Sequence, residues 1–370
     1  MTPDDLYKKS IDMILENQHP SGGYVASPTF PTYNYCWFRD GAYIAHAMDL
    51  AGELESADQF HDWAANNILR RQEQLDQVCC LVDEGREIPE ELHLHTRYTL
   101  DGNEGNMEWE NFQLDGLGTW LWSLGEHLKC REIPLPADRV KLSDAMADKV
   151  SRWKKAAALV ISYLKRIWAL PCYDLWEENR NGIHIYTLSS IYGGLKSGGQ
   201  FLEVSTGEVC EKIKDRILKR GVVEGHLSKF EGSSLVDGSL IGVSIPYGVF
   251  ELDEPLMRAT AVKIEEDLLR AGGVHRYRGD TYYGGGIWIL LRGWLALYQL
   301  EMGDRNAAEE ALLWMCGQAD SEGHLPEQVS DDLLDSEMLQ GWIDKWGDSA
   351  SPLLWSHAVY IWLYNKLKFN

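Results

Sequence analysis

Residues 287–300 read Ile-Trp-Ile-Leu-Leu-Arg-Gly-Trp-Leu-Ala-Leu-Tyr-Gln-Leu, and this stretch decides the fold. Leu290 and Trp294 recur at helical spacing along one face, while apolar side chains such as Leu295 fill the opposite face. A helix that is apolar all round is covered by protein on every side. We therefore expect a buried helix over residues 285–302 inside a helical domain.

Other segments are apolar on one face only. In residues 142–168, for example, Trp153, Val160 and Leu164 mark a single buried stripe. Alternation between the two patterns fits an inner and an outer ring of helices. No linker rich in Pro, Gly or Ser divides the chain, so we expect one all-α domain over residues 1–370. The expected helices are one opening at Pro3 and others near 40–52, 55–75, 112–128, 142–168, 187–204, 206–219, 253–270, 285–302, 304–319 and 352–368.

The composition excludes several classes of partner. With 35 basic and 57 acidic side chains, the formal net charge of −22 repels a nucleic-acid backbone or an anionic lipid surface. The 15 Trp and 17 Tyr against 8 Phe favour a pocket for a hydroxylated ring, because both side chains combine a flat face with a polar group.

The sequence also bears on the compartment. Its first residues, MTPDDLYKKSIDMILENQ, lack the basic and apolar regions of a secretory signal. Its 7 cysteines are odd in number and lack the spacing of a disulfide framework. We expect a cytoplasmic protein with reduced thiols.

The first candidate segment, residues 33–40, reads Tyr-Asn-Tyr-Cys-Trp-Phe-Arg-Asp. Its aromatic residues offer stacking surfaces for a sugar, and Arg39 with Asp40 could bind hydroxyls. Alternatively, Asp40 is only the N-cap of the next helix and Arg39 its surface neighbour. The aromatic residues are Tyr33, Tyr35 and Trp37.

Two further candidates are a carboxylate pair and a glycine-rich loop. Glu177 and Glu178 follow Trp176, and an apolar wall could raise one carboxyl pKa to give a general acid. Alternatively, the pair lies on a solvated face. Arg276 lies in the loop 274–288, which lacks the phosphate-binding patterns and could donate hydrogen bonds to a substrate.

The fourth candidate is Glu327, which follows Pro326 and could be a plain first-turn helix carboxylate. It lies 150 residues from Glu177, so the two could face each other across a ring of helices. Two carboxyls roughly 6.5–9.5 Å apart are what an inverting glycosidase needs, one as acid and one as base. No metal site is expected, since His93 and His95 lack a third ligand at a suitable spacing.

Together these segments resemble the glucoamylase family, glycoside hydrolase family fifteen. The matches occur in family order along most of the chain. They are Tyr33–Asp40 (Y-x-Y-x-W-x-R-D), Gln113–Gly118 (Q-L-D-x-x-G), Leu175–Glu178 (L-W-E-E), Arg276–Tyr283 (R-Y-x-x-D-x-Y-Y), Pro326–Gln328, and Leu354–His357 of the last helix.

The resemblance implies an (α/α)6 barrel that removes terminal glucose with inversion, releasing β-glucose without a metal or organic cofactor. It implies that Glu177 is the general acid and Glu327 the general base. Arg39 and Asp40 would bind hydroxyls of the terminal glucose, and Glu178 and Arg276 would line the same or the neighbouring subsite. The pocket wall would comprise Tyr33, Tyr35, Trp37 and Trp176.

The sequence departs from the family pattern in two places. The first motif begins at Tyr33, so we expect no N-terminal β-sandwich and no carbohydrate-binding module, and small oligosaccharides as substrates. The segment between His95 and Gln113, with Trp109, keeps only scattered similarity, so the linkage preference stays open. We expect a short α-1,6- or α-1,4-linked glucoside, with isomaltose-like disaccharides favoured and α,α-trehalose as the alternative. Rival interpretations are a sugar epimerase using His324 and His357, and a non-catalytic sugar-binding protein.

Overall fold

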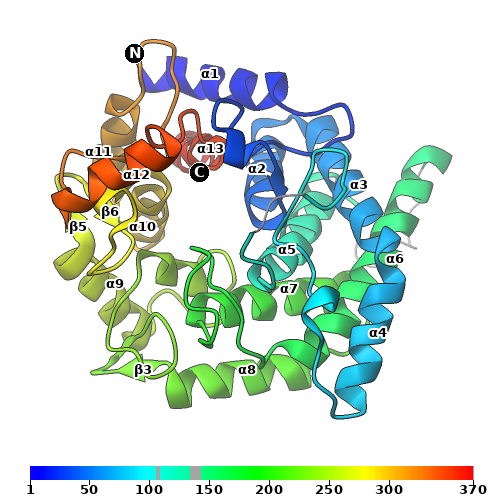
Figure 1. Ribbon diagram of the computed structural model, residues 1–370. Coiled ribbons are helices and arrows are strands. Elements are labelled where there is room, and N and C mark those ends of the chain that lie inside the picture. Colours follow the sequence, from blue (N-terminus) through cyan, green and yellow to red (C-terminus); the bar gives the residue numbers. More distant parts are fainter. Residues whose placement is uncertain (106–108, 134–142, 370) are drawn as a thin grey trace. The chain divides into compact units, whose positions relative to one another are not determined.

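The buried helix expected over residues 285–302 is α10 (Ile289–Glu301), whose residues from Ile289 to Tyr298 are all buried (Figure 1). The computed structural model describes residues 1–105, 109–133 and 143–369. Helices form most of this described chain, and none of them is long and apolar enough to span a bilayer. The prediction was wrong at one end, because Ile287–Trp288 forms strand β7, which pairs with strands on both sides.

The chain folds into two compact units, which are described separately. The expectation of a single domain stays a prediction. The first unit comprises Met1–Asn17, Ala26–Asn34 and Arg220–Asn370, and the second comprises Gln18–Val25 and Tyr35–Lys219.

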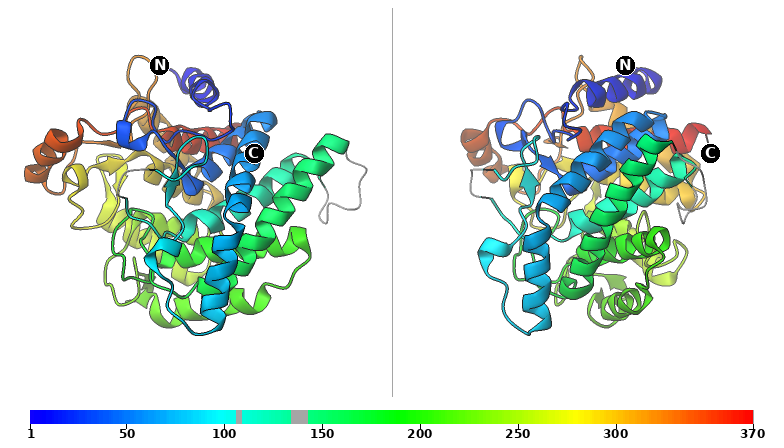
Figure 2. Two further views of the ribbon diagram at one scale, coloured as in Figure 1. Left: turned by 45° about the vertical axis from the view of Figure 1, so that its right-hand side comes forward. Right: turned by 90° about the vertical axis from the view of Figure 1, so that its right-hand side faces the viewer.

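In the second unit, α5 packs against α2 and α7, and α6 packs against α3 and α4. Figure 2 shows α6 running alongside α3 and α4. The antiparallel pair β1–β2 places Trp37 opposite Arg97. The elements are β1 (Cys36–Trp37), α2 (Phe38–Ala51), α3 (Leu54–Arg70), α4 (Gln72–Asp83), β2 (Arg97–Tyr98), α5 (Asp115–Cys130), α6 (Asp144–Ile167), α7 (Ile185–Leu202) and α8 (Gly207–Arg220), with the 3-10 helix η2 (Glu90–Leu92).

In the first unit, α10 packs against α11, α13 and η4, and α1 packs against α13. A four-stranded antiparallel sheet has the order β5-β6-β7-β8. The helices are α1 (Pro3–Glu16), α9 (Pro255–Leu268), α10, α11 (Arg305–Gly317), α12 (Leu339–Trp346) and α13 (Leu354–Phe369), with the 3-10 helices η1 (Pro31–Tyr33), η4 (Gly238–Val243), η5 (Tyr282–Gly284) and η6 (Ser336–Met338). The strands are β3 (Val222–Val223), β4 (His226–Leu227), β5 (Leu269–Arg270), β6 (Gly273–His275), β7 and β8 (Gln328–Val329).

The two classes of helix expected from the sequence are both present. In the second unit, α5 and α7 are buried on nearly every face, whereas α6 buries one stripe that includes Trp153, Val160 and Leu164. In the first unit, α13 and α10 are covered all round, and α11 is covered on one side. Because the burial follows the apolar pattern, the prediction of fully covered and half-covered helices is confirmed.

Glycines let the fully covered helices α5 and α7 approach closely. A Cβ atom at Gly118 would lie 2.4 Å from the carbonyl oxygen of Ser190, and one at Gly194 would lie 2.3 Å from the carbonyl oxygen of Gly118. Neither space admits a side chain. These glycines, unfavourable within helices on propensity alone, are therefore required by the packing.

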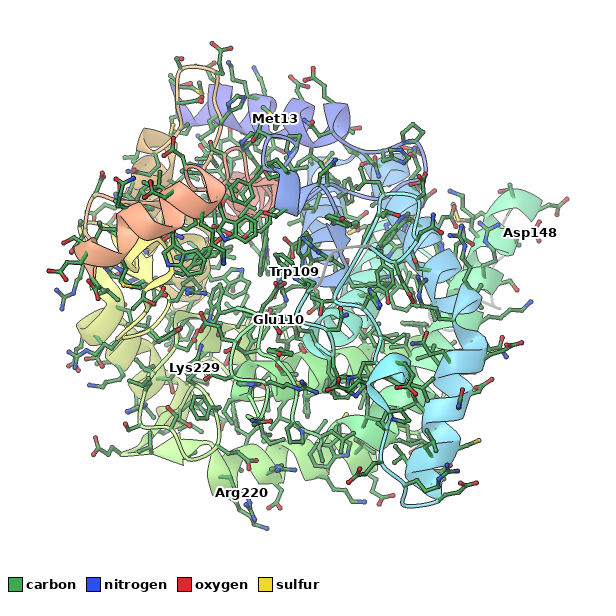
Figure 3. The ribbon with its side chains drawn as sticks, viewed as in Figure 1. Met13, Trp109, Glu110, Asp148, Arg220 and Lys229 are labelled. Atoms are coloured by element: carbon green, nitrogen blue, oxygen red, sulfur yellow. The ribbon has the colours of Figure 1, made fainter. Side chains whose placement is uncertain are left out.

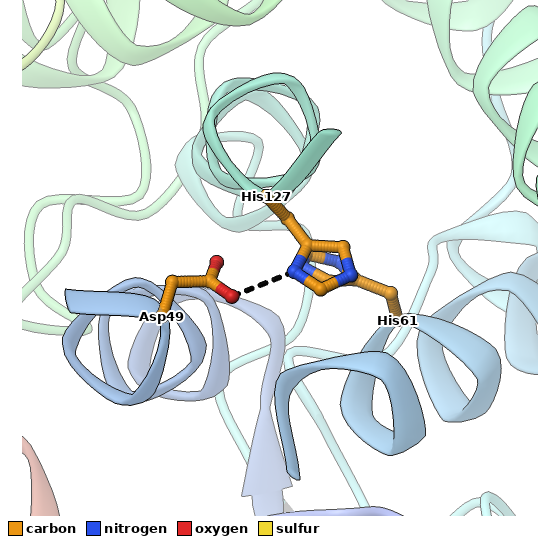
Figure 4. Close-up of side chains that lie close together, drawn as sticks. All are labelled: Asp49, His61 and His127. Atoms are coloured by element: carbon orange, nitrogen blue, oxygen red, sulfur yellow. Dashed lines mark hydrogen bonds and ion pairs between the residues drawn. The ribbon is translucent and has the colours of Figure 1, made fainter. Parts of the chain in front are cut away.

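A buried ion network joins α2, α3 and α5, and Figure 4 shows its bond between Asp49 and His127. The ring of His127 bonds Asp49 through Nδ1 at 2.7 Å and Asp58 through Nε2 at 2.9 Å. Asp58 also contacts Arg131 and Lys149 at 2.9 and 3.0 Å. Two carboxylate partners require two ring N–H donors, so His127 is an imidazolium that holds three helices together.

Candidate active site

The segment 33–40 forms a strand that runs directly into a helix. Trp37 occupies the N-cap position of α2, without a capping hydrogen bond from its side chain, and Asp40 lies within the first turn. Arg39 and Asp40 are 5% and 6% exposed. The alternative reading, in which Asp40 is an N-cap and Arg39 a surface residue, is therefore wrong.

Arg39 is surrounded by acceptors. Its Nη1 donates to Gln113 Oε1 at 3.0 Å and to Asp115 Oδ2 at 3.1 Å. Its Nε lies 3.5 Å from Asp40 Oδ2, and its Nη2 lies 3.9 Å from Glu177 Oε1. Burial alone would lower the pKa of Arg39, but the carboxylates around it, Asp115 foremost, raise the pKa above its ordinary value. Arg39 is thus a fixed cation beside two candidate site carboxyls.

Glu177 lies in a tight turn built on Asp174. The Oδ1 atom of Asp174 accepts hydrogen bonds from the backbone N–H groups of Trp176 at 3.0 Å and Glu178 at 2.8 Å. The backbone N–H of Glu177 donates to the Asp174 carbonyl at 3.0 Å. With φ at 65°, Glu177 adopts the left-handed conformation, which is uncommon for a residue with a side chain. Such strain is typical of functional positions.

The Glu177 carboxyl has the properties of a general acid. Trp37 Nε1 donates to its Oε1 at 2.6 Å, and the side chain is 17% exposed. Burial raises the pKa of Glu177 to about 7, against the opposing effects of Arg39 and the Trp37 hydrogen bond. A partly accessible carboxyl that keeps its proton near neutral pH can donate that proton to a leaving oxygen.

Asp40 is a second carboxyl with a displaced pKa. Burial raises the pKa of Asp40 to about 6, although the charge of Arg39 opposes this. Among the described residues its Oδ2 atom finds no hydrogen-bond donor and keeps only the ion pair with Arg39. An unsatisfied oxygen of this kind is suited to accept a hydrogen bond from a ligand.

Arg97 was not predicted from the sequence. The guanidinium carbon of Arg97 lies 3.4 Å from the ring centroid of Trp109 and 4.2 Å from that of Tyr35. Trp109, labelled in Figure 3, belongs to the loop that precedes α5. The pairing of β2 with β1 places Arg97 opposite Trp37, whose indole donates to Glu177.

In the first unit, Glu327 is 3% exposed and precedes strand β8. Its backbone N–H donates to the Ala350 carbonyl at 2.8 Å. Its Oε1 accepts a hydrogen bond from the Tyr33 hydroxyl at 3.0 Å, and that hydroxyl lies 2.9 Å from the hydroxyl of Tyr282. Glu327 is therefore a positioned carboxyl, and the alternative of a first-turn helix carboxylate is wrong.

Arg276 lies in the same unit and is held by Asp280, four residues further along the same loop. Its Nε and Nη2 atoms contact the two oxygens of Asp280 at 2.7 and 2.5 Å. Its guanidinium carbon lies 5.2 Å from the Tyr282 ring centroid and 5.4 Å from that of Trp288. The bidentate pair fixes the guanidinium plane at 2% exposure.

The histidines required by an epimerase have other roles. His357 is fully buried, with Nδ1 2.9 Å from Ser10 Oγ and Nε2 accepting from the Leu325 N–H at 3.1 Å. Burial lowers the pKa of His357 to about 3. His324 pairs with Asp320 at 3.0 Å near the surface. His357 thus anchors the backbone two residues before Glu327.

The structure brings the predicted site residues together in two groups. The connected group in the second unit holds Glu177 through Trp37 and Arg39, and that in the first unit holds Glu327 through Tyr33. Which of these residues touch substrate stays a prediction. The second unit contains Tyr35, Trp37, Arg39, Asp40, Trp176, Glu177 and Glu178, and the first contains Tyr33, Arg276 and Glu327.

Comparison with known proteins defines the class. Residues 3–313 match the model of glycosyl hydrolases family 15, and the chain belongs to this family. It is therefore a glycoside hydrolase. The all-α fold of the (α/α)6 class is confirmed by solved relatives. One, a variant glycosidase in complex with glucose, is 37% identical with a TM-score of 0.92, covering 99% of this chain and 96% of that one.

Three named relatives are similar to this chain. An isomaltose glucohydrolase of Kribbella flavida is 38% identical over 98% of this chain and 92% of its own length. A trehalase of Mycolicibacterium smegmatis is 26% identical over 78% of this chain and 46% of its own. The glucoamylase structure from Hormoconis resinae, 17% identical with a TM-score of 0.65 over 99% of this chain and 73% of that one, shows the fold alone.

Proposed function

We propose that this protein is an exo-acting, inverting α-glucosidase. Its substrates are short α-1,6- or α-1,4-linked gluco-oligosaccharides, isomaltose-like disaccharides foremost, and it releases β-glucose from the non-reducing end. Similarity to the isomaltose glucohydrolase along nearly the whole chain supports this substrate class. A formal net charge of −22 is compatible with a neutral sugar and unfavourable for an anionic ligand.

The observation that carries the proposal is the state of Glu177. A general acid in a glycosidase must be protonated at working pH and must reach the glycosidic oxygen. The pKa of about 7, the hydrogen bond from Trp37 and the partly exposed carboxyl meet both conditions. We assign Glu177 as the acid.

Glu327 serves as the base. The Tyr33 hydroxyl donates to Oε1 and so fixes the carboxylate without supplying a full positive charge. In the proposed step, Glu327 removes a proton from water as the water oxygen attacks C1. The bond from C1 to the glycosidic oxygen breaks, and Glu177 donates its proton to that oxygen. The two carboxyls must then flank the sugar roughly 6.5–9.5 Å apart.

The remaining residues bind the glucose. Asp40 accepts hydrogen bonds from hydroxyls through its unsatisfied oxygen, and Arg39 donates. Arg276 and Glu178 line the same or the neighbouring subsite. The aromatic residues that form the pocket wall are Tyr33, Tyr35, Trp37 and Trp176.

A second candidate is an α,α-trehalase. It is favoured by similarity to two proteins named trehalase, at 26% and 23% identity. Trehalose carries the same terminal α-glucosyl group, so the proposed acid and base would act on it unchanged, and only the leaving-group contacts would differ.

A panel of isomaltose, maltose, panose, dextran and trehalose, with glucose as the readout, tests the substrate class. Isomaltose should give the highest kcat/KM. Proton NMR of the first product should show β-glucose, because attack by water on the opposite face inverts C1. Initial α-glucose would refute inversion, and turnover of trehalose alone would replace the first candidate with the second.

A further inference from the structure

The surface helix α12 of the first unit takes no part in the proposed catalytic steps (Figure 1). None of its eight residues is buried, so the hydrophobic core does not account for its position. Its two tryptophans, Trp342 and Trp346, are half-buried. Trp342 contacts the 3-10 helix η5, and η5 carries a tyrosine that is hydrogen-bonded towards Glu327. This connection makes α12 a candidate for a role in the reaction.

Three contacts join the Trp342 side chain to η5 and to the residue before it. The Nε1 atom of Trp342 donates to the carbonyl oxygen of Thr281 at 3.0 Å. Its ring lies edge-on to the ring of Tyr282, with centroids 4.9 Å apart, and stacks on the ring of Tyr283 at 6.0 Å. Ring pairs in these geometries are favourable beyond the area that they bury. Trp342 therefore holds both tyrosines of η5 from the surface side of the fold.

The backbone of η5 requires such support. Tyr283 has φ 48° and ψ 39°, a left-handed conformation that is an outlier for a bulky residue. A strained conformation of this kind persists only where its surroundings hold it in place. The hydroxyl of Tyr283 donates to the carbonyl oxygen of Gly347, the residue after α12, at 2.9 Å. Together with the stack on Trp342, this bond ties the strained turn to α12.

Tyr282 connects the same turn to the proposed base. Its hydroxyl lies 2.9 Å from the hydroxyl of Tyr33, which in turn lies 3.0 Å from Oε1 of Glu327. A tyrosine hydroxyl has one proton, and the proton of Tyr33 is directed to Glu327. The bond between the two tyrosines therefore has Tyr282 as its donor. A displaced Tyr282 ring would move the hydroxyl that orients the carboxylate.

We propose that Trp342 is a positioning residue for the base: it holds the ring of Tyr282, which through the hydroxyl of Tyr33 fixes the carboxylate of Glu327. This inference rests on the proposed function, in which Glu327 is the base. Trp342 acts through Tyr282 and not by a contact of its own with the sugar.

Two variants and a matched control test this role. Trp342→Leu removes the ring contacts and the hydrogen bond, whereas Trp342→Phe keeps a ring beside Tyr282 and loses the hydrogen bond to Thr281. Trp346→Leu is the control, because Trp346 is a half-buried tryptophan of the same helix whose ring contacts Lys345, with Nζ 4.8 Å from the ring centroid. Thermal unfolding establishes that each variant is folded before its kinetics are measured.

Trp342→Leu should lower kcat for isomaltose by about 10- to 100-fold and leave KM within about twofold, because a misplaced catalytic group slows the reaction without weakening substrate binding. Trp342→Phe should lose kcat several-fold, and it carries the test if Trp342→Leu does not fold. Trp346→Leu should match the wild type. An unchanged kcat in the Trp342 variants, an equal loss in Trp346→Leu, or a rise in KM at constant kcat overturns the proposal.

A double-mutant cycle tests the route through Tyr282. Tyr282→Phe removes the hydroxyl that bonds Tyr33, so the addition of Trp342→Leu to this variant should lower kcat by no more than about twofold. If the losses of the two single variants multiply instead, Trp342 acts by another route and the proposal fails. Full activity in Tyr282→Phe also refutes it.

Crystal structures of the wild type, Trp342→Leu and Trp346→Leu give a readout that needs no activity. The distance between the hydroxyls of Tyr282 and Tyr33 should exceed hydrogen-bond range in Trp342→Leu and stay near 2.9 Å in Trp346→Leu. An unchanged distance in Trp342→Leu refutes the inference, even if the wild type hydrolyses glucosides. A lengthened distance supports the inference, and if the wild type then hydrolyses no glucoside, only the proposed function is refuted.

Discussion

At the scale of single residues, the pKa of Glu177 results from opposing effects. Burial raises it to about 7, whereas Arg39 and the Trp37 indole oppose that rise. Because the acid must carry its proton, kcat/KM should fall as the pH increases through about 7. A pH profile with isomaltose checks this. Glu177→Gln should lower kcat by roughly a thousandfold or more.

Glu224→Gln is the matched control for Glu177→Gln. Glu224 also has a positive φ, 48°, but is exposed in the turn between β3 and β4. It should keep the activity of the wild type, so that loss in Glu177→Gln reflects the carboxyl and not the strained backbone. Comparable loss in both variants would contradict the assignment of Glu177 as acid.

Asp40 offers a test in which activity and stability move in opposite directions. Its folded pKa of about 6 lies above the ordinary value of 3.8, so ionisation between those values costs folding stability as the pH increases. Asp40→Asn should therefore unfold at a higher temperature at pH 7. It should lose about 10- to 100-fold in kcat/KM, since charge-assisted hydrogen bonds to glucose are lost.

Thermal unfolding and kinetics, measured on one preparation of Asp40→Asn, test both the expected gain in stability and the expected loss of activity. A residue that only capped α2 would give almost no stability change, because Asn caps a helix about as well as Asp does. Asp12→Asn, an exposed position of α1, should alter neither quantity. Full activity in Asp40→Asn would remove Asp40 from the glucose site.

The sequence motifs singled out Arg39, Glu177 and Glu327 as candidates, because charged residues near tryptophan or proline are recognisable in one dimension. They could not supply the left-handed backbone of Glu177, which arises from the hydrogen bonds of Asp174 to the turn. Arg97 carried no signal either. Its position depends on a two-residue strand pair with Trp37, 60 residues away in sequence.

At the scale of elements, apolar periodicity predicted the long helices and failed for short ones. The segment expected as one helix over 55–75 is divided, since α3 ends at Arg70 and α4 begins at Gln72. No glycine or proline marks that bend. Helix α12 has no buried residue, so the pattern that reveals other helices is weak in it. Helix α5 begins at Asp115, three residues later than expected.

The ion network around His127, whose bond to Asp49 is drawn in Figure 4, yields a prediction about the helices that it joins. Burial would lower the pKa of His127, but hydrogen bonds to Asp49 and Asp58 raise it above the ordinary value of 6.5. The network therefore stabilises the fold below about pH 6.5, and this contribution is lost as the pH increases through the raised pKa. His127→Gln should lose about 3 kcal/mol at pH 6 and less at pH 9.

Urea unfolding of the wild type and His127→Gln at both pH values measures this difference. His19→Gln is the control, because His19 is a half-buried histidine of the same unit that lies outside the network and bonds Ser21. It should unfold as the wild type does at each pH. A loss in His127→Gln that grows towards pH 9 would show that His127 is neutral in the folded protein.

At the scale of the whole molecule, the two proposed catalytic carboxyls belong to different units, Glu177 to the second and Glu327 to the first. Glu177 is held by the indole of Trp37 and lies beside the guanidinium of Arg39. Glu327 is held by the hydroxyl of Tyr33. The proposed mechanism assigns them different tasks on one substrate. A substrate whose leaving group needs no proton therefore distinguishes these tasks.

α-Glucosyl fluoride is such a substrate, because fluoride leaves without general-acid help, whereas attack by water still needs a base. Glu177→Gln should retain most of its rate on the fluoride while losing nearly all of its rate on isomaltose. Glu327→Gln should lose its rate on both substrates by roughly a thousandfold or more, because attack by water needs the base whichever group leaves. If the two variants instead lose the same rate on the fluoride, Glu177 binds the sugar and does not protonate the leaving oxygen. A Glu327→Gln variant that hydrolyses the fluoride normally would mean that the base lies elsewhere.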